Sequence, residues 1–316
     1  MWWYYAGIVT AIMMTTYMAA TRSRKRQEKD VLPLFNDVVK TGNMGFHEGA
    51  NIQVRVKYFN SSHIIGRIVG VDKEHVHPVW RVNDTVVFPI VDVPFPSRSV
   101  MYLDTNDVLL RVDGGSVSDD DLVQFLGTMS GGRWLEALNH HCKPGQFVLF
   151  PLLNNEEDLV AVRIASLCGA RAVAMTNDFS GLGPLFLRLG GEKLFSQGDD
   201  EGVLQWTQGG VHVVLQDISL VPHVSLKWLR KLGKLVLSFS DPGKVRRDGV
   251  QPVSDVFQQV TDSISIIGAH DASRKSYRQL LRFCQTGQLQ FPIDRIPLRQ
   301  FLQGSRTLRP SQVVAV

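Results

Sequence analysis

Residues 147 to 175 constrain the fold of this chain more than any other stretch. The segment FVLFPLLNNEEDLVAVRIASLCGARAVAM opens with an apolar run at 147–150 and passes into a polar turn. A stretch with helical apolar periodicity follows, and Gly169 ends it before a second apolar run. Two parallel strands need a helix-length connection between them. The segment therefore predicts a strand–turn–helix–strand unit in a parallel α/β sheet.

The same alternation of strands and helices continues from about residue 120 to residue 287. Strands are predicted at QFVLFPL, ARAVAMT, EKLFS, VHVVLQD, KLVLSFS and SISIIGA. Helices are predicted between and after them, at LGPLFLRLG, VSLKWLRKLG and YRQLLRFCQTGQL. This order favours a doubly wound parallel sheet with helices on both faces. We expect the chain to contain an α/β domain of the Rossmann type.

Short strands dominate the part of the chain before this domain. Apolar and polar residues alternate in NIQVRVKYF, and GRIVGVD, VNDTVVFPIVDVPF and VMYLDTNDVLLRVD follow. Such closely spaced strands predict a small β-barrel. Ser118 and the three aspartates after it then predict a capped helix start, and the tail after residue 287 returns to short strands.

The first 21 residues differ from the rest. MWWYYAGIVTAIMMTTYMAA carries no charge and would be about 30 Å long as a helix, the thickness of a hydrocarbon core. The predicted anchor residues are an aromatic belt and a basic flank: Trp2, Trp3, Tyr4, Tyr5, Arg22, Arg24, Lys25 and Arg26. We expect a single transmembrane helix at 1–21, followed by a basic flank and linker at 22–49. A peripheral or targeting helix is the alternative.

Several site classes are disfavoured. The three cysteines of this 316-residue chain stand far apart without a CxxC, so we expect buried free thiols and no metal site. The histidine pairs His75/His77 and His140/His141 are interpreted as solvated pairs. Basic residues are dispersed after position 26, which disfavours nucleic-acid binding.

Five phrases resemble the medium-chain dehydrogenase/reductase superfamily. They are HCKPGQFVLF, IASLCGARAVAM, GGVHVVLQDI, LRKLGKLVLSF, and FCQTGQLQFPIDRIPLRQFLQGSR followed by PSQVVAV. The resemblance is greatest to the zinc-free quinone reductases and the mitochondrial 2-enoyl thioester reductases. It implies a truncated GroES-like β domain at 50–117 with 288–316, and a Rossmann-type domain at 118–287.

The resemblance also implies where a nicotinamide dinucleotide would bind. Members carry T-G-A-x-G-G-V-G after the first strand, and the glycine positions fall here on Leu152, Asn155, Glu156 and Asp158. Glycines there let the backbone approach the pyrophosphate. A carboxylate about 5 Å from a phosphate opposes binding by roughly 3 kcal/mol at an effective dielectric of 20. We therefore predict a degenerate loop, no cofactor and no catalytic residue.

Two further departures concern single residues. Members that use NADPH place a basic residue after the second strand, where this chain has Asp178, which could instead accept a ribose hydroxyl. The stretch that carries the proton-donating tyrosine of enoyl reductases is almost absent, and Tyr58 stands too early to replace it. We interpret Tyr58 as a strand aromatic.

The main hypothesis is a non-catalytic, membrane-anchored accessory subunit of a mitochondrial inner-membrane complex, with respiratory complex I the expected host and the soluble domain in the matrix. Its partners would be neighbouring subunits and the bilayer. The alternative is an NAD(P)H-dependent 2-enoyl thioester or quinone reductase with a divergent cofactor loop. A third hypothesis is a lipid or acyl-carrier binder without redox chemistry.

Overall fold

The computed structural model describes residues 50–72, 77–90, 100–154, 156–217, 226–238, 264–269, 272–303, 308 and 311–316. The chain divides into two compact units. The first contains residues up to 57, residues 62–114 and Val316, and the second contains residues 58–61 and 115–315. The assignment of 288–316 to the β domain stays a prediction.

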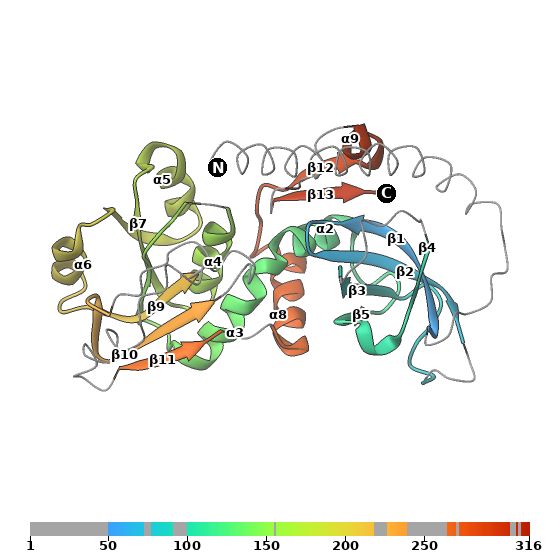
Figure 1. The fold of residues 1–316 in the computed structure, drawn as a ribbon, viewed down its shortest axis with the longest axis horizontal. Coiled ribbons are helices and arrows are strands. Elements are labelled where there is room, and N and C mark those ends of the chain that lie inside the picture. Colours follow the sequence, from blue (N-terminus) through green and yellow to red (C-terminus); the bar gives the residue numbers. More distant parts are fainter. Residues whose placement is uncertain are drawn as a thin grey trace, which may run out of the picture. The chain divides into compact units, whose positions relative to one another are not determined.

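The first unit is built from short antiparallel strands (Figure 1). They are β1 (Ile52–Phe59), β2 (His63–Val71), β3 (Thr85–Pro89), β4 (Val100–Leu103) and β5 (Leu110–Val112), with the 3₁₀ turn η1 (Thr105–Asp107). β4 pairs with β1, and β3 pairs with both β2 and β5. A Cβ at Gly66 in β2 would lie 2.3 Å from Val54 Cγ1 in β1. Glycine is therefore required where these strands pack.

A buried carboxylate fixes the turn that precedes β3. Asp84 accepts hydrogen bonds from the Arg81 and Gly114 backbone N–H groups at 3.1 and 3.3 Å. It also forms a 2.8 Å ion pair with Arg111, and its side chain is only 5% exposed. Asn83, beside it, has φ 78°, which asparagine tolerates better than most residues. Both carboxylate oxygens of Asp84 thus accept from donors in and around this turn.

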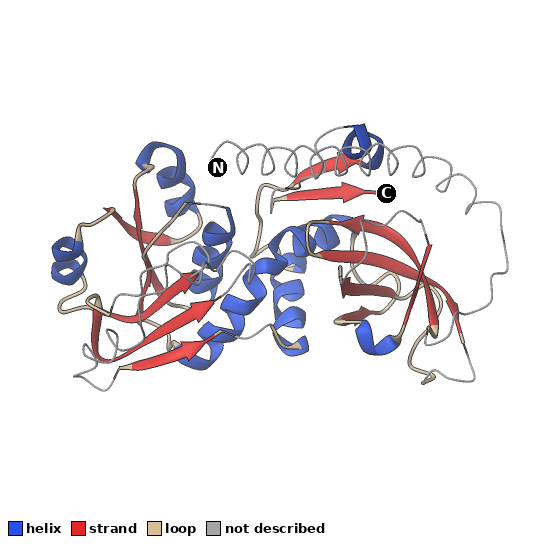
Figure 2. Cartoon of the chain, viewed as in Figure 1, coloured by secondary structure: helices blue, strands red, loops and turns tan. Residues whose placement is uncertain are grey.

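The second unit contains a six-stranded sheet in which every pair is parallel. Its strand order is β11-β10-β9-β6-β7-β8. The strands are β6 (Phe147–Phe150), β7 (Arg171–Thr176), β8 (Gly191–Ser196), β9 (Val211–Asp217), β10 (Leu229–Ser238) and β11 (Ser265–Gly268). Helices lie between most of these strands along the chain, and Figure 2 draws the helices in blue and the strands in red. The predicted Rossmann-type sheet is confirmed.

The described helices of the second unit are α2 (Asp119–Thr128), α3 (Gly132–His141) after the 3₁₀ turn η2 (Met129–Gly131), α4 (Glu156–Leu167), α5 (Phe179–Arg188), α6 (Asp200–Trp206), α8 (Arg274–Gln285) and α9 (Leu298–Gln303). Two of these helices have a predicted start or end signal, Ser118 before α2 and Gly169 after α4. The Ser118 hydroxyl caps α2 by accepting from the Asp121 N–H at 3.1 Å, as predicted. Gly169 follows α4 with φ 76°, the left-handed conformation that ends helices.

The sheet core explains why these strands form. Apolar side chains of β6, β7, β8, β9 and β10 and of the segment just before β10 pack with α6 in one buried cluster: Phe147, Leu149, Val173, Met175, Phe195, Val203, Val211, Val214, Leu226, Trp228 and Leu235. Such strands carry near-continuous apolar runs because a parallel sheet is buried on both faces.

One predicted helix is wrong. The stretch VSLKWLRKLG was expected to be helical, but β10 already begins at Leu229, where it pairs with Val211 of β9. The register then shifts before Lys234, and Leu232 sits at φ 63°. The apolar residues whose spacing suggests a helix pack in the core instead, because Leu226 and Trp228 are buried against the sheet.

The C-terminal tail returns to strands. β12 (Asp294–Pro297) pairs in parallel with β13 (Gln312–Ala315), and β13 pairs antiparallel with the end of β1 through Tyr58 and Phe59. Within the described residues no helix is both long and apolar enough to cross a membrane. The predicted anchor and its flank at 1–49 lie outside the described residues, so the transmembrane helix stays a prediction.

Candidate functional site

The centre of the parallel sheet is where this fold places a ligand. β6 and β9 are neighbours, and the chain order runs outward from them in both directions. Ligands of doubly wound sheets bind beyond the carboxyl ends of the strands at such a switch point. Here β6 leads into residues 151–154 and then α4, while β9 ends at Asp217.

The backbone of the 151–154 loop is engaged with the protein itself. The Leu153 N–H donates to the Met175 carbonyl at 2.8 Å, and the Leu153 carbonyl accepts from the Thr176 hydroxyl at 3.0 Å. The Asn154 N–H donates to Asp158 Oδ2 at 3.1 Å. A phosphate-binding loop would present such N–H groups to its ligand. In this chain the Met175 carbonyl of β7 and the Asp158 carboxylate accept from these two N–H groups.

The described residues beside the loop define a small cavity, which we call the switch-point cavity. The switch-point cavity has a volume of about 10 Å³. It is lined by Trp134, Phe150, Pro151, Leu152, Asp158, Leu215, Gln216 and Asp217. A single water needs about 10–15 Å³ by this measure, and ligand sites span about 300–1,000 Å³. As far as the described residues define it, this cavity has room for one water.

The predicted loop residues have different outcomes. Leu152 and Asp158 both line the switch-point cavity. Asn155 lies outside the described residues, and Glu156 is described only as the first residue of α4. Leu153, which the sequence did not single out, is completely buried beneath the loop.

An ion pair completes the wall of the switch-point cavity. Arg133 Nη2 lies 3.3 Å from Asp217 Oδ2, with side-chain exposures of 17% and 6%. The Arg133 guanidinium also lies 5.3 Å from the Trp134 ring centroid. The one acidic side chain at the carboxyl end of β9 is thus neutralised by the protein. The sequence signal for such a residue is a carboxylate at the end of an apolar strand.

The glycine pair before Arg133 serves helix packing. A Cβ at Gly131 would lie 2.5 Å from Ile164 Cδ1, and one at Gly132 would lie 3.0 Å from a Tyr277 ring carbon. These glycines therefore allow α3 to approach α4 and α8 closely.

Asp178, the residue expected at a ribose, is used as a helix cap. Its Oδ1 accepts from the Gly181 N–H at 2.8 Å and from the Ser180 hydroxyl at 3.3 Å. Its own N–H donates to Thr176 Oγ1 at 3.0 Å. The side chain therefore stabilises the start of α5 without a ligand.

Tyr58 lies in β1, opposite Ala315 of β13. Partial burial and the neighbouring Asp119 carboxylate, to which the hydroxyl is hydrogen-bonded, raise the pKa of Tyr58 above its ordinary value. A raised pKa keeps the phenol protonated at neutral pH. The contact with Asp119 supports the interpretation of Tyr58 as a strand aromatic.

No metal site is found among the described residues, where no three His, Cys, Asp or Glu side chains cluster suitably. His75 lies outside the described residues, and the His77 ring accepts from the Val79 N–H at 3.3 Å. His140 is 2.9 Å from Glu136 on the same helix, and its ring centroid is 6.1 Å from that of His141.

The cysteines are free, but only one is fully buried. Cys284 is buried, whereas Cys142 and Cys168 are half-buried. Burial raises the pKa of Cys142 and Cys168 to about 11 and that of Cys284 to about 12. All three thiols are therefore protonated at neutral pH and poorly nucleophilic.

Known structures share this architecture. A quinone oxidoreductase of Pseudomonas syringae pv. Tomato DC3000 is 17% identical, with a TM-score of 0.66 over 88% of this chain and 94% of that one. The CurK enoyl reductase is 17% identical, with a TM-score of 0.61 over 87% and 94%. The chain has the medium-chain dehydrogenase/reductase fold. No family model matches its sequence.

The similar structures include one that was solved with a bound cofactor. The Escherichia coli quinone oxidoreductase, solved in complex with NADPH, is 16% identical, with a TM-score of 0.66 over 88% of this chain and 94% of that one. An NAD-dependent alcohol dehydrogenase is 18% identical, with a TM-score of 0.62 over 87% and 95%. At these identities the likeness establishes the fold, and the activity has to be argued from the site.

Proposed function

We propose that this chain is a non-catalytic protein of the reductase fold, without nicotinamide-dependent activity. The observation that supports it is the switch-point cavity, which has a volume of only about 10 Å³. Leu152 and Asp158, at two glycine positions of the expected loop, line that cavity together with the ion-paired Asp217. A dinucleotide bound there would have to displace the side chains that now fill the space.

Electrostatics oppose binding as well. The pyrophosphate of a dinucleotide is anionic, and Asp158 stands at the start of α4 where those charges would be placed. A carboxylate about 5 Å from one phosphate charge opposes binding by roughly 3 kcal/mol. A micromolar ligand has about 8 kcal/mol of binding free energy in total. Steric and electrostatic terms therefore act in the same direction.

The biological role within this proposal is structural. An uncharged N-terminal segment with aromatic residues and a basic flank supports a membrane anchor. We propose an accessory subunit of a mitochondrial inner-membrane assembly, with respiratory complex I as the host and the described domain on the matrix side. This step rests on the N-terminal sequence and on the small switch-point cavity, and not on the similar structures described above.

The second candidate is an NAD(P)H-dependent quinone or enoyl thioester reductase. The structural comparisons support this candidate better than they support an accessory subunit, since similar structures include quinone oxidoreductases and enoyl reductases. It requires the 151–154 loop to leave its hydrogen bonds with β7 when the dinucleotide arrives.

Calorimetric titration of the full chain in mild detergent with NADH and NADPH separates the two candidates. The non-catalytic proposal predicts no saturable heat below about 1 mM nucleotide, and the reductase predicts a Kd below about 100 μM. The double variant Leu152→Gly/Asp158→Gly tests the stated cause, because it removes both bulk and charge from the switch-point cavity. Saturable binding by the unaltered chain would overturn the proposal.

A further inference from the structure

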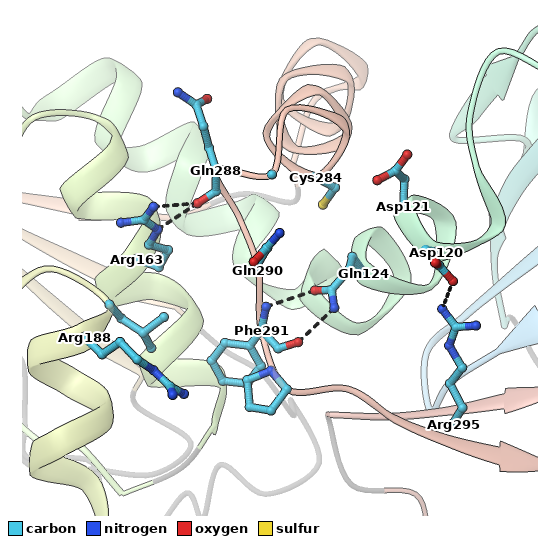
Figure 3. A pocket seen from close by; sticks show the side chains of 13 residues that line it. Asp120, Asp121, Gln124, Arg163, Arg188, Cys284, Gln288, Gln290, Phe291 and Arg295 are labelled. Carbon is cyan, nitrogen blue, oxygen red and sulfur yellow. Dashed lines mark hydrogen bonds and ion pairs between the residues drawn. The ribbon is translucent and has the colours of Figure 1, made fainter.

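A large cavity lies elsewhere in the second unit. It has a volume of about 760 Å³ and is lined by residues of α2, α4, α5, α8 and the segment 287–295 (Figure 3). This α2–α8 cavity shares no lining residue with the switch-point cavity. Its size falls within the range of about 300–1,000 Å³ typical of small-molecule sites.

Specific hydrogen bonds hold the walls of the α2–α8 cavity. The Gln124 side chain donates to the Phe291 carbonyl at 2.9 Å and accepts from the Phe291 N–H at 3.0 Å. Arg163 donates through Nε and Nη2 to the Gln288 carbonyl at 2.8 and 2.7 Å. Both contacts fasten the 287–295 segment to helices that belong to the same unit. The cavity is therefore a built feature of the fold.

The acidic side chains of the cavity already have partners. Asp120 forms an ion pair with Arg295, and the two lie together on one side of the cavity (Figure 3). Asp121 accepts from the Ser118 hydroxyl at 2.6 Å as part of the cap of α2. Neither carboxylate neutralises the arginines on the opposite side.

That opposite side is cationic. Figure 3 shows Arg163 and Arg188 there, with Gln290 nearer the middle of the cavity. Arg163 contacts only the neutral Gln288 carbonyl, and no described carboxylate forms an ion pair with it or with Arg188. Among the described residues, the side chains of Arg188 and Gln290 form no hydrogen bond or ion pair.

We propose that the α2–α8 cavity binds a small organic oxyanion, a molecule with a phosphate or carboxylate group. Arg188 and Gln290 would hold the charged group, because guanidinium and amide N–H groups donate to oxyanions in a directional way. The positive charge of Arg163 further stabilises the bound anion. Leu189 and Pro292 provide apolar surface for the rest of the ligand. Arg188 also stands in the last turn of α5, where a cation is favourable. The assignment therefore rests on the volume of the cavity and on Gln290 as well as on this charge.

Two probes test the site on the full chain in mild detergent: inorganic pyrophosphate and succinate, each titrated by calorimetry. We expect saturable binding of at least one, which distinguishes a phosphate from a carboxylate ligand. Arg188→Gln should lower the affinity by about tenfold or more, since it removes a charge-assisted contact. Gln290→Glu should abolish binding, because it places a carboxylate beside the bound oxyanion.

Arg282→Gln is the matched control. Arg282 is also exposed in the last turn of a helix, α8, but does not line the cavity, so its loss should change the affinity by less than about twofold. Thermal melts check that each variant is folded. If Gln290→Glu melts early, Gln290→Ala tests the same contact and should weaken binding, although less than the glutamate would. The proposal is wrong when neither probe saturates at about 10 mM, or when Arg282→Gln weakens binding as much as Arg188→Gln.

Discussion

Two cavities of the same unit differ in size by a wide margin. The switch-point cavity, where doubly wound sheets bind their ligands, has about 10 Å³, and the α2–α8 cavity has about 760 Å³. The first is bounded by buried side chains and a mostly buried ion pair, and the second by exposed arginines and glutamines. The strand order of the fold is thus retained, while the described side chains leave little room at the switch point.

The largest effect should come from the loop below the switch-point cavity. Leu153 is completely buried, so Leu153→Ala should lower the free energy of unfolding by about 3 kcal/mol through lost burial and a new void. Urea denaturation followed by circular dichroism measures this change. Leu187→Ala is the control, because Leu187 is 59% exposed and its loss should cost under about 0.5 kcal/mol. Equal effects of the two variants would show that the loop is not part of the core.

The ion pair between Arg133 and Asp217 should have the next largest effect. Asp217→Asn leaves the mostly buried guanidinium without its counter-charge and should destabilise the fold by about 2 kcal/mol. Arg133→Met combined with Asp217→Asn should recover part of that loss, which a double-mutant cycle measures. Additive losses in the cycle would mean that the two side chains do not interact.

Glu136 links two helices, each of which lies beside one of the two cavities. α3 carries Arg133, beside the switch-point cavity, and α8 carries Cys284, in the wall of the α2–α8 cavity. Burial alone would raise the pKa of Glu136, but the hydroxyls of Ser273 and Ser276, each 2.5 Å from Oε2, outweigh it. The Ser273 N–H and His140 add to this effect, and the pKa is lowered from 4.5 to about 2.

A lowered pKa means that this stabilisation is complete above pH 4.5 and is lost as the pH falls toward about 2. We expect Glu136→Gln to cost about 1–2 kcal/mol at pH 7, and the gap to the unaltered chain to narrow between pH 4.5 and 2. Denaturation at a series of pH values tests this. Glu201→Gln, at an exposed position of α6, should show no such pH dependence. A gap that stays constant down to pH 2 would contradict the role of the carboxylate.

The smallest effect concerns the wall of the α2–α8 cavity. Gln124→Ala removes both hydrogen bonds to Phe291 and should destabilise the fold by about 1 kcal/mol. It should also weaken oxyanion binding, because the 287–295 segment loses an attachment. Gln205→Ala is an exposed control outside that cavity. Unchanged stability and binding in Gln124→Ala would show that the segment is held by other contacts.

Periodicity in the sequence identified most of the fold. Apolar runs located all six strands of the parallel sheet, and Ser118 and Gly169 marked real helix ends. The helix predicted over VSLKWLRKLG failed because tertiary pairing of Leu229 with Val211 outweighed local apolar spacing. Local apolar patterns do not show where the register between two strands shifts, or that a strand begins before its apolar run.

The sites were predictable to different degrees. The switch-point cavity could be anticipated, because residues 151–158 are contiguous and can be compared with a glycine-rich loop. Its Arg133–Asp217 pair joins residues 84 apart in sequence and was missed. The α2–α8 cavity combines residues from Asp120 to Arg295, which only the folded chain brings together.

A structure of the full chain determined with saturating NADPH tests the central claim most directly. The account predicts no nucleotide between the carboxyl ends of β6 and β9, with Leu153 still hydrogen-bonded to Met175 and Asp217 still paired with Arg133. A dinucleotide resting on residues 151–158, with its pyrophosphate at the start of α4, would contradict it and establish the reductase-type site.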